Sequence, residues 1–172
     1  METPAWPKNA FFPFLGWDDV YGFNMNAIRR LAIREPLVDC VDKKQIVTTP
    51  SLLIEIDLYH VKVEDLAFTT PFRLQIRRDD YIQAFVAYFS VEFSKCHKRT
   101  GFSTSPEYQY THWKHTVFYM DKAITANSGT FIDGTFQIKP NSINKRDLDI
   151  EIYVQYHGPY DDVTSGFSYK MR

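Results

Sequence analysis

The chain has 172 residues, a formal net charge of −1, 44% hydrophobic residues and 16% aromatic residues. This length is typical of one domain with its own core, and the composition excludes a disordered chain. The small net charge excludes an overall field that would attract nucleic acid.

The cysteines and the hydrophobic runs indicate the compartment. Cys40 and Cys96 are too few for a disulfide framework, so we expect a reduced, cytoplasmic or nuclear protein. The first residues lack the pattern of a signal peptide. No apolar run approaches the roughly 20 residues that span a bilayer, so we expect no membrane association.

Residues 1–16 are predicted to be irregular, because Pro4, Pro7 and Pro13 interrupt any regular helix or strand. From Trp17 to Ile33 the pattern becomes helical, with apolar residues at spacings of three and four. A glycine near its start weakens the first turns, so we predict a turn followed by a helix. The proline that follows this stretch ends the helix.

The rest of the chain alternates apolar and polar residues, which is typical of half-buried strands. Turn residues such as Asn127-Ser128-Gly129 separate the runs. The predicted strands are 52–58, 72–76, 81–93, 113–120, 132–138, 148–156 and 166–171. We therefore predict a mainly β fold, an antiparallel β-barrel or barrel-like sandwich with a short helical arm near the N-terminus.

The stretch 96–120 concentrates polar and aromatic groups between two predicted strands. It contains three of the five histidines, and Gly101 and Pro106 predict a loop within it. The residues 110–113, Tyr-Thr-His-Trp, come immediately before an apolar strand. Polar loops held by strands are frequent functional sites, so this is the candidate site.

Three stretches resemble the protein arginine methyltransferases of the asymmetric-dimethylating kind. Residues 110–119, YTHWKHTVFY, resemble the Thr-His-Trp loop of that family. Residues 21–25, YGFNM, resemble part of its dimerisation arm, and 35–39, EPLVD, resemble the return into its barrel. The resemblance covers about residues 17–172 and implies the carboxy-terminal β-barrel of such an enzyme.

The resemblance implies three parts: a divergent segment 1–16, a dimerisation arm 17–34 and a substrate-binding β-barrel 35–172. The arm is implied to dock on the cofactor domain of a second subunit, and its family matches are Trp17, Tyr21, Phe23 and Met25. The family has a further barrel strand before the arm, for which this chain shows no match. We expect the aromatic residues 11–15 to cover the resulting gap.

In the family, the Thr-His-Trp loop forms one side of the pocket for the substrate arginine. The resemblance therefore implies catalytic roles for His112 and Trp113 and substrate binding by Tyr110 and Thr111. His112 would pair with a carboxylate from the part of the enzyme that precedes the barrel. Trp113 would pack beside the guanidinium group.

The implied activity is methylation of arginine side chains by S-adenosylmethionine, in Arg/Gly-rich or histone-tail proteins. No two of the seven glycines lie within four residues of each other, so we expect no S-adenosylmethionine site in this chain alone. By itself the chain is expected to be inactive and to act in a homo-oligomer. The alternative is a regulatory or binding module that associates with a full-length family member or with Arg/Gly-rich partners.

Two other kinds of chemistry are disfavoured by spacing. Cys96, His97, His112 and His115 are types that bind zinc, but their spacing fits no standard zinc pattern, so no metal is predicted. The serines near His112 lie in no Gly-x-Ser-x-Gly turn, and no third group for a triad is evident.

Overall fold

The computed structural model describes residues 19–172. It is a mainly β protein with one short α-helix, α1 (Asn26–Ala32), and two short 3-10 helices, η1 (Lys43–Gln45) and η2 (Val63–Leu66). No helix in the described part is long and apolar enough to cross a membrane. The strands are β1 (Leu37–Asp39), β2 (Phe68–Gln75), β3 (Asp80–Ala87), β4 (Ser90–Phe93), β5 (Thr100–Ser103), β6 (His115–Ala126), β7 (Phe131–Pro140), β8 (Leu148–His157) and β9 (Asp162–Met171).

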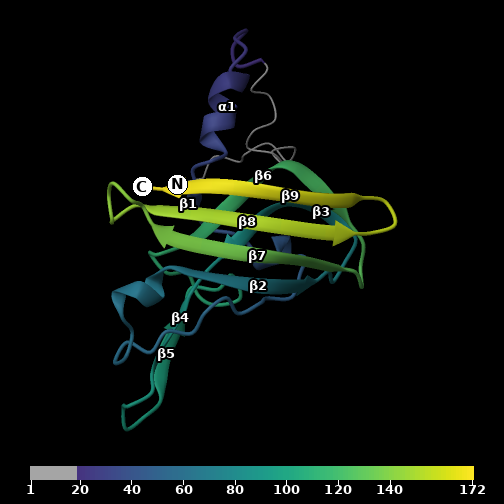
Figure 1. Ribbon diagram of the computed structural model, residues 1–172. Coiled ribbons are helices and arrows are strands. Elements are labelled where there is room, and N and C mark those ends of the chain that lie inside the picture. The colour runs from purple at the N-terminus through teal and green to yellow at the C-terminus, as the bar shows by residue number, and fades with distance from the viewer. Residues whose placement is uncertain (1–18) are drawn as a thin grey trace, which may run out of the picture.

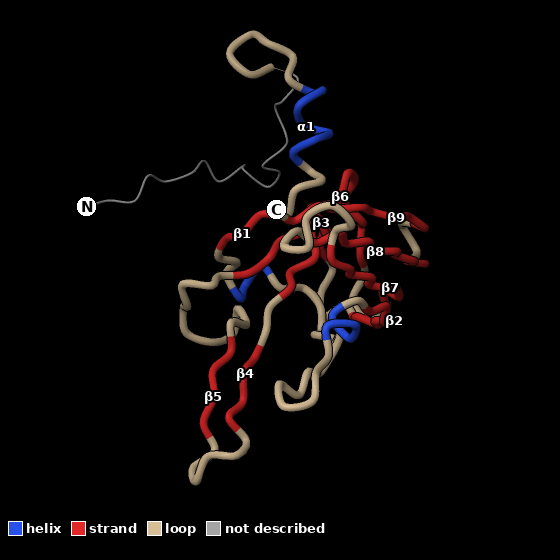
Figure 2. The backbone as a smooth tube through the Cα atoms, turned by 60° about the vertical axis from the view of Figure 1, so that its left-hand side comes forward, coloured by secondary structure: helices blue, strands red, loops and turns tan. Residues whose placement is uncertain are grey.

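The strands form two facing sheets and a separate hairpin (Figure 1). One sheet has the order β2-β7-β8-β9, the other has the order β1-β6-β3, and every pairing is antiparallel. The β4–β5 hairpin projects from one end of the body (Figure 2). The predicted mainly β, barrel-like sandwich with a helical arm is therefore confirmed, although the two sheets do not close into a continuous ring among residues 19–172.

The core lies between the two sheets and contains aromatic side chains from both. Phe118 on β6 contacts Tyr169 on β9 and Phe136 on β7, with ring centroids 5.1 Å and 6.3 Å away. The Tyr169 hydroxyl donates a hydrogen bond of 2.8 Å to the backbone oxygen of Tyr119. Burial, with a smaller contribution from Asp121, raises the pKa of Tyr169, so this donor keeps its proton at neutral pH.

The helical arm projects beyond the sheets and begins, as predicted, with a turn (Figure 2). Val20 and Phe23 form an antiparallel bridge across this turn, and Gly22 has a φ of 86° that glycine adopts readily. Ile33, directly after α1, is buried at the base of the arm. The backbone N–H of Lys170 donates to the oxygen of Arg34 at 2.8 Å, which attaches this base to β9.

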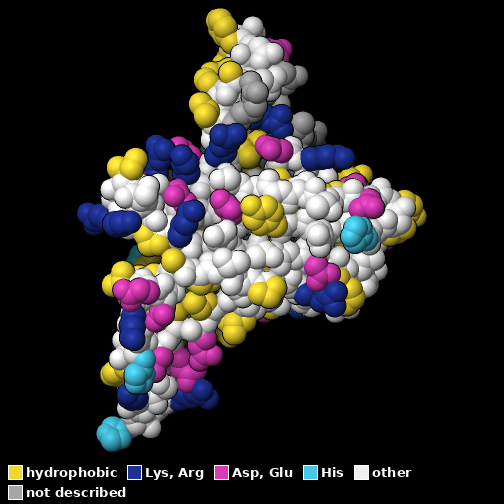
Figure 3. All heavy atoms as spheres, in the orientation of Figure 1, with side chains coloured by type: hydrophobic (Ala, Val, Ile, Leu, Met, Phe, Trp, Pro, Cys, Tyr) yellow, Lys and Arg dark blue, Asp and Glu magenta, His cyan; other side chains and the backbone are white. Residues whose placement is uncertain are grey.

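Apolar side chains gather on the surface of the arm (Figure 3). Tyr21 and Phe23 are 98% and 72% exposed, and Leu31 is 66% exposed. Met25 is half-buried. The arm therefore presents an apolar surface that the rest of the described chain leaves uncovered.

The predicted strand 52–58 is wrong, because this segment is extended but pairs with no strand in the described part of the chain. Its backbone makes no hydrogen bond between residues 50 and 56 with any described residue. Leu52 and Leu58 are 75% and 80% exposed. The alternation is real, but a strand also requires a neighbour on which one face is buried.

The predicted strand 81–93 is two strands, and part of the predicted loop after it is also a strand. The chain leaves the sheet at Phe89, whose backbone N–H donates to Thr104 Oγ1. β4 then pairs with β5, which includes Gly101. A Cβ at Gly101 would lie 2.2 Å from the Val91 oxygen, so glycine permits the close approach of these strands.

Some expectations concern residues that the structure does not describe. The irregular segment 1–16, Trp17 and the covering role of residues 11–15 lie outside the described residues. The division into an arm 17–34 and a barrel 35–172 remains a prediction.

The packed core predicts a position-dependent effect of one substitution. Ile150→Ala on β8 removes a side chain that is 2% exposed, and we expect it to lower the free energy of unfolding by about 2–5 kcal/mol. The control is Ile143→Ala in the β7–β8 connection, where the same side chain is 94% exposed, and its effect should be within about 0.5 kcal/mol. Equal effects in urea titrations would contradict this account of the core.

Candidate functional site

The candidate site is a tight turn between β5 and β6. The backbone N–H of Lys114 donates to the oxygen of Thr111 at 3.1 Å, which closes a four-residue turn. Lys114 has a φ of 56°, the left-handed conformation that residues with a Cβ rarely adopt. His112 and Trp113 therefore occupy the two central positions at the tip of the turn.

The aromatic rings at this tip are packed on one another. The indole of Trp113 stacks on Phe102 of β5, with centroids 5.0 Å apart and planes at 12°. It also contacts Phe89 edge-on at 5.9 Å. The ring centroids of His112 and Trp113 lie 3.9 Å apart, and Trp113 is still 48% exposed. The two side chains are thus held in place but remain accessible.

The base of the turn is attached to the segment that follows β1. Lys114 Nζ lies 3.6 Å from a carboxylate oxygen of Asp39. The backbone N–H of Val41 donates to Nδ1 of the buried His115 at 2.9 Å. Burial and, to a lesser extent, the Asp39 carboxylate raise the pKa of Tyr119, which lies further along β6.

The structure brings the four predicted site residues together on one loop, but in different environments. His112 and Trp113 are in ring contact. Tyr110 is 71% exposed and extends toward solvent. The hydroxyl oxygen of Thr111 is buried and has no hydrogen-bond partner among the described residues. A buried hydroxyl without a partner is uncommon in folded proteins.

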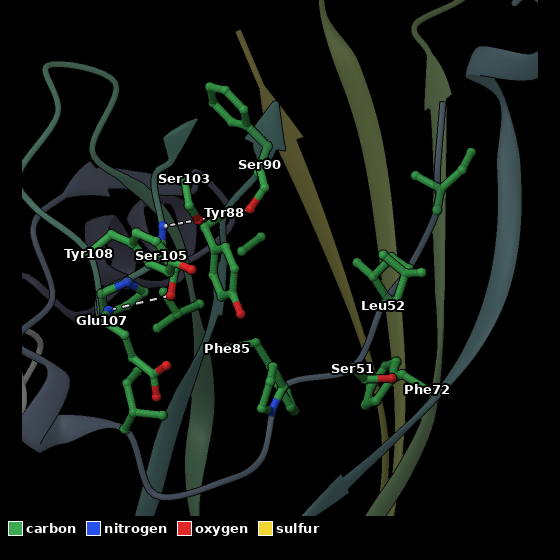
Figure 4. A pocket seen from close by; sticks show the side chains of 18 of the residues that line it. Ser51, Leu52, Phe72, Phe85, Tyr88, Ser90, Ser103, Ser105, Glu107 and Tyr108 are labelled. Carbon is green, nitrogen blue, oxygen red and sulfur yellow. Dashed lines mark hydrogen bonds between the residues drawn. The ribbon is translucent and has the colours of Figure 1, made fainter. Parts of the chain in front are cut away.

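The serines of the loop have structural partners (Figure 4). The Ser90 hydroxyl donates to Ser103 Oγ at 2.8 Å, and the Ser105 N–H donates to the same oxygen at 3.1 Å. Ser103 and Ser105 are both buried. Within residues 19–172 neither hydroxyl bonds to a histidine, so these serines fix the shape of the loop.

Beside the turn lies an open cleft of about 2300 Å³ (Figure 4). The extended segment 50–58 forms one side of it and β3 and β4 form the other, with Leu52, Phe72 and Phe85 among the apolar side chains that face the space. None of residues 110–113 lines this cleft. Among the described residues, the cleft is therefore separate from the candidate site.

The described residues fit neither a metal ion nor a nucleotide-like cofactor. Cys96 and His97 lie in the turn that connects β4 to β5, whereas His115 begins β6. Within the described range no group of three His, Cys, Asp or Glu side chains is placed to hold a metal ion. Residues 19–172 also do not fit S-adenosylmethionine, because α1 follows a simple turn rather than a strand and a glycine-rich loop.

Comparison with known proteins identifies the family. Residues 12–158 match the family model described as the arginine methyltransferase oligomerization subdomain. The chain belongs to the protein arginine methyltransferase family. It is 56% identical over 155 residues to protein arginine N-methyltransferase 1 of Caenorhabditis elegans and 51% identical over 156 residues to protein arginine N-methyltransferase 8-B of Danio rerio.

The similarity covers nearly all of this chain but less than half of each relative. These two matches cover 90% and 91% of the chain, and 44% and 37% of the relatives. The fold matches the Trypanosoma brucei PRMT1 enzyme–prozyme heterotetrameric complex with AdoHcy, with a TM-score of 0.87, 32% identity, and coverage of 91% of this chain and 50% of that one. It also matches Arabidopsis thaliana protein arginine methyltransferase 10, with a TM-score of 0.74 and 19% identity over 90% of this chain and 49% of that one.

Sequence reasoning singled out the loop 110–113 as the candidate site but missed the residues that support it. Phe102 carries the stacked indole, yet it was assigned to a loop without a role. Lys114 lies inside the matched motif, but nothing in its spacing indicates a left-handed backbone or the contact with Asp39. No local signal in the sequence indicates the role of Phe102, because its ring contacts come from Phe89 and Trp113, which are distant in the chain.

Proposed function

We propose that this chain forms the barrel part of a protein arginine N-methyltransferase and that its Thr111–Lys114 turn supplies one side of the pocket for the substrate arginine. One observation carries the proposal. The rings of His112 and Trp113 lie 3.9 Å apart at an exposed tip whose backbone is closed by a hydrogen bond. Groups that act on a substrate need both a fixed position and access from outside.

Trp113 has the geometry to contact a planar guanidinium group. Its indole is stacked on Phe102, which supports it on one side and limits its rotation, while 48% of the residue stays exposed. A guanidinium binds favourably over or beside an indole through the electrostatic field of the ring. Trp113 would therefore orient the arginine and exclude water from one side of it.

His112 has free ring nitrogens with which to meet a carboxylate. Within residues 19–172 the imidazole makes no hydrogen bond and no ion pair, and it is exposed. A carboxylate brought close from another part of the enzyme would favour the imidazolium form. The imidazolium would fix the position of that carboxylate, and the carboxylate would accept the proton that the arginine nitrogen loses on methylation.

The exposed arm gives the proposal its oligomeric part. The resemblance implies that Trp17, Tyr21, Phe23 and Met25 dock on a second subunit, and aromatic and methionine side chains are suited to such contacts. Tyr21 and Phe23 are largely exposed here and lack a cover in the described chain. We propose a homo-oligomer or an association with a full-length family member, acting on Arg/Gly-rich or histone-tail proteins.

A second candidate is a non-catalytic subunit that regulates a full-length methyltransferase. It is supported by the similarity of the fold to the Trypanosoma brucei enzyme–prozyme complex, together with the arm of this chain that the other described residues leave uncovered. Co-expression with a full-length family member separates the two candidates. A regulatory subunit forms a stable mixed oligomer and changes the rate of its partner, and the absence of any mixed species would dismiss this role.

The 172-residue chain alone should bind no S-adenosylmethionine and transfer no methyl group to an Arg/Gly-rich peptide, because the described residues do not fit that cofactor. Titration calorimetry and a methyl-transfer assay measure both. Saturable heat with a stoichiometry near one would show that the chain contains a cofactor site and would refute this part of the proposal.

A substitution tests the role proposed for His112. In a complete enzyme, made by placing this barrel in the Caenorhabditis elegans relative, His112→Ala should lower kcat by roughly 10²–10⁴-fold, the range for a group that moves or holds a proton. The matched control is His157→Ala, since His157 is also exposed and its Nδ1 pairs with Asp162 at the end of β8, on the larger sheet. A normal rate with His112→Ala would remove the role assigned to this residue.

A further inference from the structure

We propose that Lys114 and His115 are positioning residues, through which the segment Asp39–Val41 sets the orientation of the His112–Trp113 turn. The inference rests on the proposed function, because that function places one side of the pocket for the substrate arginine at this turn. Neither Lys114 nor His115 would touch the substrate. They would hold His112 and Trp113, which would touch it, in one position.

The backbone at Lys114 is the first observation. Its φ of 56° is unfavourable for any residue with a Cβ, and glycine would adopt it more readily. The chain nevertheless has a lysine at this position, and its Nζ lies 3.6 Å from a carboxylate oxygen of Asp39. The ion pair gives the side chain at this left-handed position a contact that glycine could not make.

The second observation is the next residue. His115 is the first residue of β6, and its backbone is opposite Asp39 in the β1–β6 register. Its buried ring accepts a hydrogen bond from the Val41 N–H at Nδ1, so the ring proton of the neutral form is on Nε2. Two consecutive residues that leave the turn are therefore attached to one short segment, 39–41.

The third observation is what the tip lacks. On the β5 side, the turn is supported by the stack of Trp113 on Phe102. His112 makes no polar contact, and the Thr111 hydroxyl has no partner, within the described residues. If the side-chain contacts of Lys114 and His115 were removed, the turn would keep its closing backbone hydrogen bond and the ring contacts of Trp113, but it would lose its side-chain attachment to the segment 39–41. The two rings could then rotate about the strained residue.

The orientation of the turn can be measured in this chain without any enzyme activity. Fluorine NMR of protein labelled with fluorotryptophan gives one signal for each of its three tryptophans, and Trp113→Phe identifies the signal of Trp113. We expect Lys114→Met, Asp39→Asn and His115→Leu each to shift or broaden that signal. His115→Asn, which keeps an acceptor near the position of Nδ1, should retain more of the original signal.

Two further variants separate positioning from a general effect of lost charge. The exchange of the pair, Asp39→Lys with Lys114→Asp, should return the Trp113 signal toward that of the unmodified chain. Asp133→Asn removes a closer ion pair, in which Arg73 Nε lies 2.6 Å from Asp133, on the other sheet. It should leave the Trp113 signal unchanged. An unchanged signal in Lys114→Met, Asp39→Asn and His115→Leu alike would overturn the inference.

The consequence for turnover is measured in the complete enzyme that carries this barrel. Lys114→Met should lower kcat roughly 10- to 100-fold with a much smaller change in KM, because a displaced turn misaligns a bound arginine. The exchanged pair should recover most of that loss. A normal kcat in Lys114→Met, in an enzyme that His112→Ala inactivates, would also overturn the inference.

The two measurements keep this inference apart from the proposed function. If His112→Ala left the rate unchanged, the proposed function would fail, and with it the effect on turnover. The fluorine spectrum of the chain would still decide whether the segment 39–41 orients the turn.

Discussion

The hydrogen bond from the Tyr169 hydroxyl to the Tyr119 backbone oxygen joins the two sheets on which the rest of the structure depends. Tyr169 is a buried residue of β9, the edge strand of the four-stranded sheet. Tyr119 belongs to β6, the central strand of the three-stranded sheet. The ring of Phe118 packs against the same tyrosine. Because β6 begins directly after the candidate turn, this contact determines where the turn lies relative to the larger sheet.

The site combines a rigid base with an accessible tip, and different parts of the chain supply each. The base comes from backbone pairing, with β1 against the first residues of β6. The tip comes from an irregular loop, in which Phe102 supports Trp113 by ring stacking. This arrangement explains how an exposed indole can keep one orientation. The buried serines contribute to this, because their hydrogen bonds at Ser103 Oγ hold the loop that precedes the turn.

The sequence predicted those strands that pair with a neighbouring segment of the chain in which apolar and polar residues also alternate. β7 and β8 alternate clearly, and each is paired along almost its whole length with the next strand of the chain. The segment 52–58 alternates equally well but has no neighbour in the described residues, and period two cannot reveal whether a neighbour exists. β5 was missed for the opposite reason, because its small residues resemble a loop and only the pairing with β4 makes it a strand. The candidate motif was singled out through resemblance, whereas the contact of Lys114 with Asp39 joins residues 75 positions apart and cannot be predicted from local patterns.

The open cleft beside β3 has a thermodynamic consequence for the whole barrel. Its apolar side chains already face inward, so any segment that fills it buries surface on both sides at once. A segment that binds only the folded barrel stabilises it by RT ln(1 + [L]/Kd), where L is the free concentration of that segment. If the segment is covalently attached, its effective concentration is set by the length of the connection rather than by dilution. A segment that fills the cleft therefore raises the melting temperature of this barrel, and the size of the rise follows from its affinity and its effective concentration.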